Sequence, residues 1–389
     1  MQRPCNQAAK AFVSLLVKGE PIGQMEFGTG GRNSSREADL STTRRAILSK
    51  QRRKKMRKHF GVWIVVMVLA LMLTACVMPD GQVMTADGAA PVQTEAKDWP
   101  LVQDLRICHI IELGHPYSTA KVTLAGKEAE VFGFTYDVYD TQGDIPNEIR
   151  LIEDCITKQY DVIALVPYDT SALNDALREA QEAGIPVIAE GADLDEEGLG
   201  YVNTMIGSSG WAEGETAGMA VCQALEDGQG WVIIEGATGH GLVPQRSSAR
   251  EYVAENCPGR ELVAVDTGMW NREEARTVME NYLTAYPDQI HMVYCHNDDM
   301  CLGAVRAIAE AGLQDTIKVL GVDGGAKEVY DAIRDGTMWG TVLNDASFIA
   351  VKIIQSARDL AENRPVIFWQ TSPAVLITKE NVDLFPNLW

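Results

Sequence analysis

The sequence predicts an α/β protein built from two lobes, each with a parallel β-sheet. From about residue 101 onward, short apolar runs alternate with amphipathic stretches, which is typical of strands and helices that follow one another along the chain. This series is completed by about residue 206 and then repeats. The chain has 389 residues, 46% of them apolar, which is enough for two hydrophobic cores.

The first series predicts strands at 106–113, 134–140, 161–167 and 186–191, with helices at 118–133, 145–159 and 171–184 between them. A strand–helix alternation of this kind predicts parallel strands joined by right-handed crossovers. Ser118 and Ser171 begin two of the helices, and we expect both to cap them because a serine hydroxyl can accept a free N–H of the first turn. Gly184 is expected to end the third helix.

The second series follows the same plan. Its expected strands are 231–236, 261–268, 292–297, 318–324 and 339–344, and its expected helices are 211–226, 243–256, 271–287, 298–312 and 326–336. Asn271 is expected to cap the third of these helices. A last helix at 346–363 and two short strands complete the chain.

The charge of the chain is divided unevenly. Residues 1–76 hold 14 of the 34 Lys and Arg but only 4 of the 54 Asp and Glu, which leaves 20 basic and 50 acidic residues in the remainder. A body this acidic is not drawn to nucleic acid or to anionic lipid by general electrostatics. The balance favours a protein that works outside the cytoplasm.

The segment before the first lobe reads as an export signal. A short basic stretch from Met56 precedes an uncharged apolar run at 61–73, which is typical of the core of a signal peptide. The run ends in LTAC, and small residues before a cysteine resemble a lipobox, so we expect cleavage before Cys76 and acylation of its thiol. Residues 1–55 are interpreted as an extension ahead of the true start at Met56, and residues 76–98 as the lipidated cysteine and a flexible tether.

Six cysteines follow Cys76: Cys108, Cys155, Cys222, Cys257, Cys295 and Cys301. None forms a CxxC pair. An exported protein can carry disulfides, but the sequence does not pair these residues. We interpret them as small residues of the core, the commoner role of a buried cysteine.

Polar and aromatic side chains gather where the expected strands end. They are Glu112, His115, Pro116, Tyr117, Glu190, His240, Arg246, Asp266, Trp270, Asn297, Asp298, Asp323 and Asn344. Ligands of open parallel sheets bind outside the carboxyl ends of the strands, so in two lobes both sets of loops can face one cleft. Amide, carboxylate and guanidinium groups pair with hydroxyls, and aromatic rings stack on C–H faces. This mixture predicts a sugar site.

Eight motifs follow one another along the chain: HPYSTA (115–120), IALVPYDTSAL (163–173), EAGIPVIAEGA (182–192), TGHGLVPQR (238–246), TGMWNREEA (267–275), HNDDMCLGAV (296–305), LGVDGG (320–325) and GTVLND (340–345). In this order, from about residue 104 to 385, the chain resembles the type I periplasmic sugar-binding family, which includes ribose-binding and glucose/galactose-binding proteins. The resemblance implies two Rossmann-like lobes with parallel sheets, joined by a hinge of several crossovers. It also implies a substrate-binding lipoprotein of an ABC transporter, with a sugar and a membrane permease as partners and no cofactor.

The resemblance implies ligand-binding roles for His115, Tyr117, Glu190, His240, Arg246, Trp270, Asn297, Asp323 and Asn344. Tyr117 and Trp270 occupy the positions of the aromatic rings that would sandwich the sugar. Arg246 matches the arginine that spans hydroxyls and the ring oxygen. Glu190 stands in the place of an Asp, and His115 replaces the usual Asn or Asp.

Two departures from the family pattern bear on the ligand. Val166 replaces an Asn and so removes one hydroxyl partner, and Leu242 replaces an acidic contact of the glucose/galactose branch. Trp270, Asn344 and His240 favour a hexose, whereas the first-lobe residues do not. A pentose, a polyol or another small polar ligand therefore stays open.

The expected division of the chain is 99–206 with 345–372 for the first lobe and 207–344 with 373–389 for the second, and we expect a monomer. The main alternative function is a sensor that passes the closed state to a chemoreceptor or sensor kinase. An enzyme using His240, Glu190 or Asp298, and a metal site at Cys295, His296 and Cys301, are weaker alternatives. A repressor that shares these two lobes is a further alternative. It needs a helix-turn-helix ahead of the lobes, where this chain has the expected signal and tether.

Overall fold

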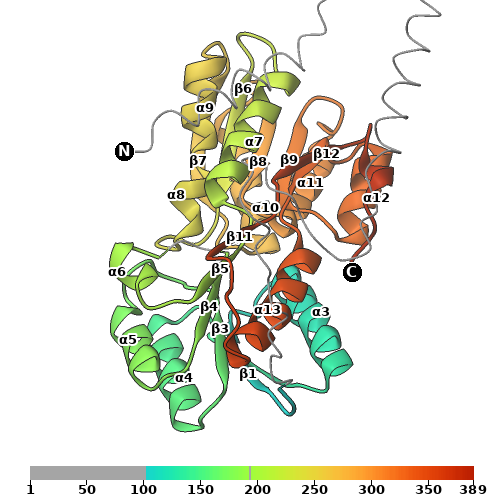
Figure 1. Ribbon diagram of the computed structural model, residues 1–389. Coiled ribbons are helices and arrows are strands. Elements are labelled where there is room, and N and C mark those ends of the chain that lie inside the picture. The colour runs from blue at the N-terminus through green and yellow to red at the C-terminus, as the bar shows by residue number, and fades with distance from the viewer. Residues whose placement is uncertain (1–101, 192–193) are drawn as a thin grey trace, which may run out of the picture. The chain divides into compact units, whose positions relative to one another are not determined.

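A computed structural model describes residues 102–191 and 194–389 of the chain (Figure 1). The expected signal peptide, Cys76 and the tether lie outside these residues. Among the described helices, none combines the length and the apolar character needed to cross a membrane.

Two six-stranded sheets form the framework, and each is the centre of one lobe. The sheet of the first lobe has the order β11-β5-β4-β3-β1-β2, from the strands β1 (Arg106–Ile111), β2 (Thr135–Asp140), β3 (Val162–Leu165), β4 (Val187–Glu190), β5 (Thr204–Gly207) and β11 (Trp369–Thr371). The sheet of the second lobe has the order β12-β10-β9-β8-β6-β7, from β6 (Gly230–Glu235), β7 (Glu261–Thr267), β8 (Ile290–Cys295), β9 (Lys318–Asp323), β10 (Gly340–Leu343) and β12 (Val375–Thr378). Every pairing is parallel except that of β10 with β12.

The helices are α3 (Pro116–Phe132), α4 (Ile145–Thr157), α5 (Asn174–Glu182), α6 (Glu196–Leu199), α7 (Gly210–Ala224), α8 (Leu242–Arg246), α9 (Ala249–Asn256), α10 (Arg272–Ala285), α11 (Asp298–Glu310), α12 (Lys327–Asp335) and α13 (Ala346–Ala361), with a short 3₁₀ turn at Val382–Leu384. The single helix expected at 243–256 is divided into α8 and α9. The division falls at Ser247 and Ser248, and the hydroxyl of Ser248 donates to the carbonyl of Gln245. The predicted α/β fold class with two parallel-sheet lobes is confirmed.

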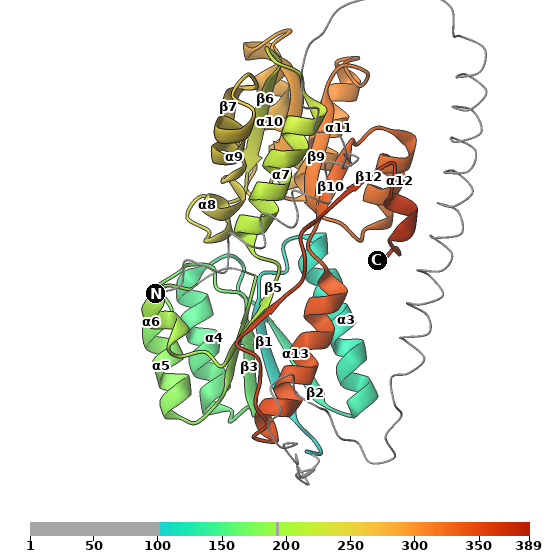
Figure 2. The same cartoon turned by 45° about the horizontal axis from the view of Figure 1, so that its top comes forward.

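The chain passes between the two sheets three times. It leaves the first sheet after β5, returns after β10 to form α13 and β11, and leaves again to form β12 at the edge of the second sheet. Helix α13 lies beside α3 on the first lobe (Figure 2). These three connections constitute the crossovers between the lobes.

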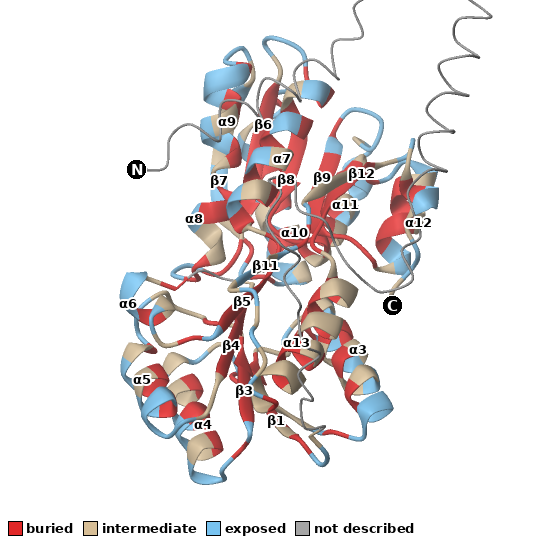
Figure 3. Cartoon of the chain, in the orientation of Figure 1, coloured by how far each residue is buried: buried red, intermediate tan, exposed pale blue. Residues whose placement is uncertain are grey.

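Helices cover both faces of each sheet, so the inner strands are buried on both sides, whereas the edge strands β2, β7 and β11 are partly exposed (Figure 3). Along β6, Ile234 belongs to a core that includes Met279 of α10, while Ile233 belongs to the opposite core with Val221 of α7. This alternation follows from the two-residue period of a strand. It explains why the strands read as continuous apolar runs in the sequence.

Two of the expected helix caps are wrong, and one is confirmed. Helix α3 begins at Pro116 with His115 as its N-cap, so Ser118 lies within the first turn. Helix α5 begins at Asn174, because the preceding residues form a turn in which a carboxylate oxygen of Asp169 accepts the N–H groups of Ser171 and Ala172. Asn271 caps α10 as expected, with its side chain accepting two N–H groups.

The interpretation of all six cysteines as unpaired core residues is wrong for four of them. Cys108 of β1 is bonded to Cys155 of α4, and Cys222 of α7 is bonded to Cys257 after α9. Each lobe therefore holds one disulfide that ties two of its elements together. Cys295 and Cys301 are free and buried.

The first-lobe disulfide is expected to contribute to stability. Replacing Cys108 and Cys155 together by alanine removes a crosslink between residues 47 apart, which restricts the unfolded chain. We expect the free energy of unfolding to fall by about 2–4 kcal/mol in urea titrations. Peptide mapping without reductant supplies the control, and the absence of a linked Cys108–Cys155 peptide from the wild-type digest would contradict the assignment.

Candidate functional site

A cavity is lined by loops that follow the strands of both lobes. Its lining consists of Ile111, Glu112, His115, Tyr117, Ser118, Lys121, Thr141, Val166, Tyr168, Gly191, His240, Leu242, Arg246, Trp270, Asn297, Asp323, Asn344 and Ile349. Eight of the nine ligand-binding residues expected from the sequence are in this set, and Glu190 is not. The carboxyl ends of parallel strands meet at one edge of a sheet, which is why residues distant in sequence come together here.

Trp270 is the main aromatic wall of the second-lobe side. Its side chain is almost fully buried, and its ring meets that of His240 edge to face with 5.3 Å between centroids. The indole lies against Gly236, where an added Cβ would stand 2.0 Å from a ring carbon. The backbone of Trp270 is left-handed, with φ of +57°. A bulky residue seldom adopts this costly conformation, and such residues gather at binding sites.

Tyr117 supplies the aromatic ring of the first-lobe side. Its hydroxyl is buried and has no hydrogen-bond partner among the described residues. Burial raises its pKa well above the usual value, and the nearby carboxylates of Asp323 and Glu213 raise it further. The hydroxyl is therefore a neutral donor. The ring also meets that of Trp389 edge to face, with 5.9 Å between centroids.

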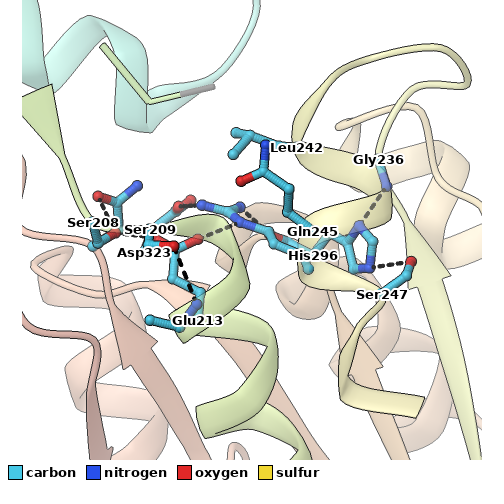
Figure 4. Close-up of polar contacts among 12 residues, drawn as sticks. Ser208, Ser209, Glu213, Gly236, Leu242, Gln245, Ser247, His296 and Asp323 are labelled. Carbon is cyan, nitrogen blue, oxygen red and sulfur yellow. Dashed lines mark hydrogen bonds and ion pairs between the residues drawn. The ribbon is translucent and has the colours of Figure 1, made fainter. Parts of the chain in front are cut away.

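Arg246 organises the polar floor of the second lobe. Its Nε donates to Glu213 of α7 over 2.7 Å, one terminal nitrogen donates to the carbonyl oxygen of His296, and the other lies 3.4 Å from Asp323 (Figure 4). Burial opposes its charge, but the carboxylates of Glu213 and Asp323 hold its pKa above the ordinary value. The guanidinium is thus charged and fixed in the cavity wall.

The two carboxyl groups near Arg246 are strongly affected by burial. Burial raises the pKa of Asp323 to about 8, although Arg246 opposes this shift. Burial also raises the pKa of Asp298 to about 7. Asp298 is the first residue of α11, and the preceding Asn297 is the N-cap, whose side chain accepts the N–H of Met300. The oxygens of Asp298 instead accept from the N–H of Gly324 and the hydroxyl of Thr341, both over 2.7 Å.

His240 and Asn344 complete the second-lobe lining. Nδ1 of His240 accepts the N–H of Leu242, and burial lowers the pKa of the imidazole to about 4, so the ring is neutral. The side-chain oxygen of Asn344 lies 3.0 Å from the hydroxyl of Ser208. These neutral groups can exchange hydrogen bonds with hydroxyls without adding charge.

Glu190 lies behind the cavity wall. It is fully buried at the end of β4, with one carboxylate oxygen 2.5 Å from His109 Nε2 and the other 2.9 Å from the ammonium of Lys121. These contacts engage both oxygens, and Lys121 rather than Glu190 is among the residues that line the cavity. Lys121 was missed in the sequence. The signal was present, because a lysine on the apolar face of a helix is rarely buried without a partner.

Two other aromatic residues were also missed. Tyr168, after β3, lines the cavity and its ring meets His240 edge to face with 4.8 Å between centroids. Trp389 lines a neighbouring hollow together with Tyr117 and His115. Both positions lie in loops, where no helical or strand periodicity marks a side chain as facing inward. Within the described residues, no group of three or more His, Cys, Asp or Glu side chains is arranged to hold a metal ion.

The residues that match a known protein family include most of this cavity. A family model described as the periplasmic binding protein domain matches residues 111–365, which is more than half of the chain. The chain belongs to the periplasmic binding protein domain family.

Individual relatives agree with the family. The ribose import binding protein RbsB of Bacillus subtilis (strain 168) is 28% identical over 268 residues, which cover 69% of this chain and 85% of that protein. The galactofuranose-binding protein YtfQ of Escherichia coli (strain K12) is 28% identical over 224 residues, 57% of this chain and 70% of that protein.

Solved structures of the periplasmic binding protein fold also match. An ABC transporter solute binding protein from Bacillus halodurans C-125 with bound myo-inositol superposes with a TM-score of 0.69 at 25% identity, covering 74% of this chain and 99% of that one. A protein from Mycobacterium smegmatis in complex with β-D-fucofuranose gives a TM-score of 0.67 at 28% identity, covering 72% and 93%.

A buried carboxyl group beside the cavity predicts a pH effect on stability. Glu148 of α4 accepts the N–H of Tyr168, and burial raises its pKa from 4.5 to about 8. A raised pKa in the folded state means that the stabilisation is complete below pH 4.5 and is lost as the pH rises toward 8. Glu148→Gln keeps an acceptor but never ionises. At the upper end of this pH range, we expect the free energy of unfolding of Glu148→Gln to be higher than that of the wild type by about 1 kcal/mol or more.

Urea titrations of both proteins at the two ends of this pH range measure the effect. The other shifted carboxyl groups titrate in both proteins, so the difference between the two proteins isolates Glu148. Stability curves that run parallel across the range would contradict a raised pKa at this residue.

Proposed function

We propose that this chain is the extracytoplasmic receptor of an ABC importer and that it binds a monosaccharide or a closely related polyol in the cavity between its lobes. The observation that carries the proposal is the lining itself. Two aromatic rings, Tyr117 and Trp270, stand among amide, carboxyl, imidazole and guanidinium groups that come from both lobes. The names of the relatives, which include ribose import and galactofuranose-binding proteins, support a sugar as the ligand and import as the role.

The polar lining suits hydroxyl groups in particular. A hydroxyl both donates and accepts, so it can bridge a carboxyl or amide oxygen and a guanidinium or phenol donor. Arg246 and the hydroxyl of Tyr117, which has no hydrogen-bond partner among the described residues, supply donors, while Asp323 and Asn344 supply acceptors. The rings of Tyr117 and Trp270 can cover the C–H faces of a sugar ring.

Apolar lining residues restrict the hydroxyl pattern. Val166 and Leu242 both line the cavity, at two of the positions where the sequence departs from the family pattern. A ligand that fits must present C–H groups rather than hydroxyls to these side chains, because an unpaired hydroxyl buried there costs free energy. This requirement selects among pentoses, hexoses and polyols by the position of their hydroxyls.

Binding is proposed to close the lobes as a hinge. Tyr168 of the first lobe meets His240 of the second, and its carbonyl oxygen accepts the N–H of Gly241 over 3.3 Å. Tyr117 and Trp389 form another pair between the lobes. A ligand that contacts both lobes stabilises this closed arrangement, which a membrane permease can then recognise. The named relatives favour such transport over a sensory role.

The export of the chain is supported by its disulfides. Cys108–Cys155 and Cys222–Cys257 are bonds that persist in oxidising compartments and are rare in the cytosol. We propose that the signal at 56–75 directs export and that acylated Cys76 anchors the protein to a membrane. The several acyl chains usual at such a cysteine suffice for stable anchoring.

A thermal-shift screen with neutral pentoses, hexoses and polyols tests the binding function. At least one should raise the melting temperature, because a ligand that binds only the folded state stabilises it. Trp270→Ala should then lower the affinity for that sugar by about tenfold or more in calorimetry, since aromatic contacts contribute about 1 kcal/mol beyond their area.

Trp211→Ala is the matched control, because Trp211 is half exposed on α7 and outside the cavity lining. Its affinity should equal that of the wild type. A wild type that responds to no member of the panel would overturn the proposed function, and equal affinities for Trp270→Ala and the wild type would remove the stacking role.

Cys76→Ser tests the proposed anchor. In bacteria that are fed labelled palmitate, the wild type should incorporate label and move to the membrane fraction, while the variant should do neither. Thr85→Ser, in the expected tether, is a control that leaves the expected lipobox and its cysteine intact. Label in the Cys76→Ser protein would show that the lipobox interpretation is wrong.

A further inference from the structure

One charged side chain of the cavity has no counterpart among the residues expected from the sequence. Lys121 lies on α3, where only 3% of the residue is exposed, and it lines the cavity together with Tyr117 and Ser118. Its ammonium is 2.9 Å from Glu190 and 5.5 Å from the centroid of the Tyr117 ring. The position of this cation is therefore set by an ion pair on one side and by an aromatic ring on another.

The carboxylate that holds Lys121 is itself rigidly placed. The second oxygen of Glu190 lies 2.5 Å from His109 Nε2, and Nδ1 of the same ring is hydrogen-bonded to the hydroxyl of Tyr136. This chain of contacts connects β2, β1, β4 and α3; His109, Glu190 and Lys121 are buried, and Tyr136 is partly buried. Side chains fixed in this way can position a donor to a fraction of an ångström.

The ammonium of Lys121 has more N–H donors than polar partners among the described residues. An ammonium carries three N–H donors, and among the described residues Glu190 is its one recorded polar partner. Burying a charged group costs free energy when some of its N–H donors have no acceptor. Lys121 is among the residues that line the cavity, so an oxygen of a bound ligand can accept one of the remaining N–H donors.

The charges around the cavity bear on the nature of that ligand. The two cations in the lining are Lys121 and Arg246, and each already has a buried carboxylate partner, in Glu190 and Glu213 respectively. Glu112 adds a further carboxyl group to the lining. The positive charge of each cation is therefore already balanced by its partner, and neither cation favours a carboxylate or a phosphate of the ligand.

We propose that Lys121 is a ligand-binding residue that donates a charge-assisted hydrogen bond to one hydroxyl of an uncharged sugar or polyol, with Glu190 as the positioning residue behind it. This inference rests on the proposed sugar-binding function and adds a specificity determinant in the first lobe. The residue would select for a hydroxyl at one position of the ligand and against acidic sugars.

The test uses the neutral sugar that gives the largest thermal shift with the wild type, and a set of its monodeoxy analogues. Lys121→Met removes the donor but leaves one carboxylate oxygen of Glu190 without its partner, so it is compared with the double variant Lys121→Met/Glu190→Gln, which removes both charges. Lys127→Met, an exposed lysine on the same helix, is the control. Melting temperatures without ligand verify that each variant is folded.

Calorimetry should give about tenfold or greater weakening of the parent sugar in the double variant, the value of a hydrogen bond to a charged group. One monodeoxy analogue, lacking the hydroxyl that Lys121 contacts, should bind the wild type and the double variant with the same affinity. Lys127→Met should match the wild type. The direct contact would be overturned if the double variant bound the parent sugar as tightly as the wild type does. It would also be overturned if the affinity fell by the same factor for the parent and for every analogue, and Lys121 would then be only a structural ion-pair partner.

The uronic acid and the phosphorylated form of the same sugar test the charge argument. Both should bind the wild type at least about tenfold more weakly than the parent. Equal or tighter binding of either would overturn the preference for an uncharged ligand. If the wild type binds no neutral sugar at all, the proposed function fails and this inference fails with it. If the wild type binds but the Lys121 variants are unaffected, only the inference fails.

Discussion

The guanidinium of Arg246 is held from three sides by groups on different elements, and the second-lobe wall of the cavity depends on this arrangement. Glu213 reaches it from α7, the carbonyl of His296 from the end of β8, and Asp323 from the end of β9. A buried ion pair contributes little net stability because desolvation opposes it, but breaking one leaves an unpaired buried charge. The contacts of Arg246 therefore determine the positions of the second-lobe loops rather than the net stability of that lobe.

Much of the fold follows from local patterns in the sequence. Parallel strands covered on both faces appear as continuous apolar runs, and this signal gives β1, β3, β6 and β8 within about two residues. Helix beginnings were harder to place, as Ser118 and Ser171 demonstrate, because a proline or an upstream Asp turn can move the first helical residue. The disulfides were not predictable, since pairing depends on which strand and helix lie together in space.

The cavity was predictable to the extent that parallel topology determines it. Loops at the carboxyl ends of the strands must converge, so the order of strands and helices along the chain is enough to bring His240, Trp270 and Asn344 together. Topology does not determine how deep a side chain lies. Glu190 ends its strand at the expected place but is drawn inward by His109 and Lys121, two residues that no strand-end argument selects.

The two lobes thus prepare the ligand site by different means. In the second lobe, the recognition groups bind one another, so Arg246 and Asp323 are ordered before any ligand arrives. In the first lobe, the hydroxyl of Tyr117 has no hydrogen-bond partner among the described residues and Lys121 has one polar partner there, Glu190, so both residues have donors that a ligand can use. On the proposed function, the ordered groups of the second lobe would hold the sugar, and the remaining donors of the first lobe would gain hydrogen bonds from it. Closure of the first lobe would then depend on the hydroxyl pattern of the ligand.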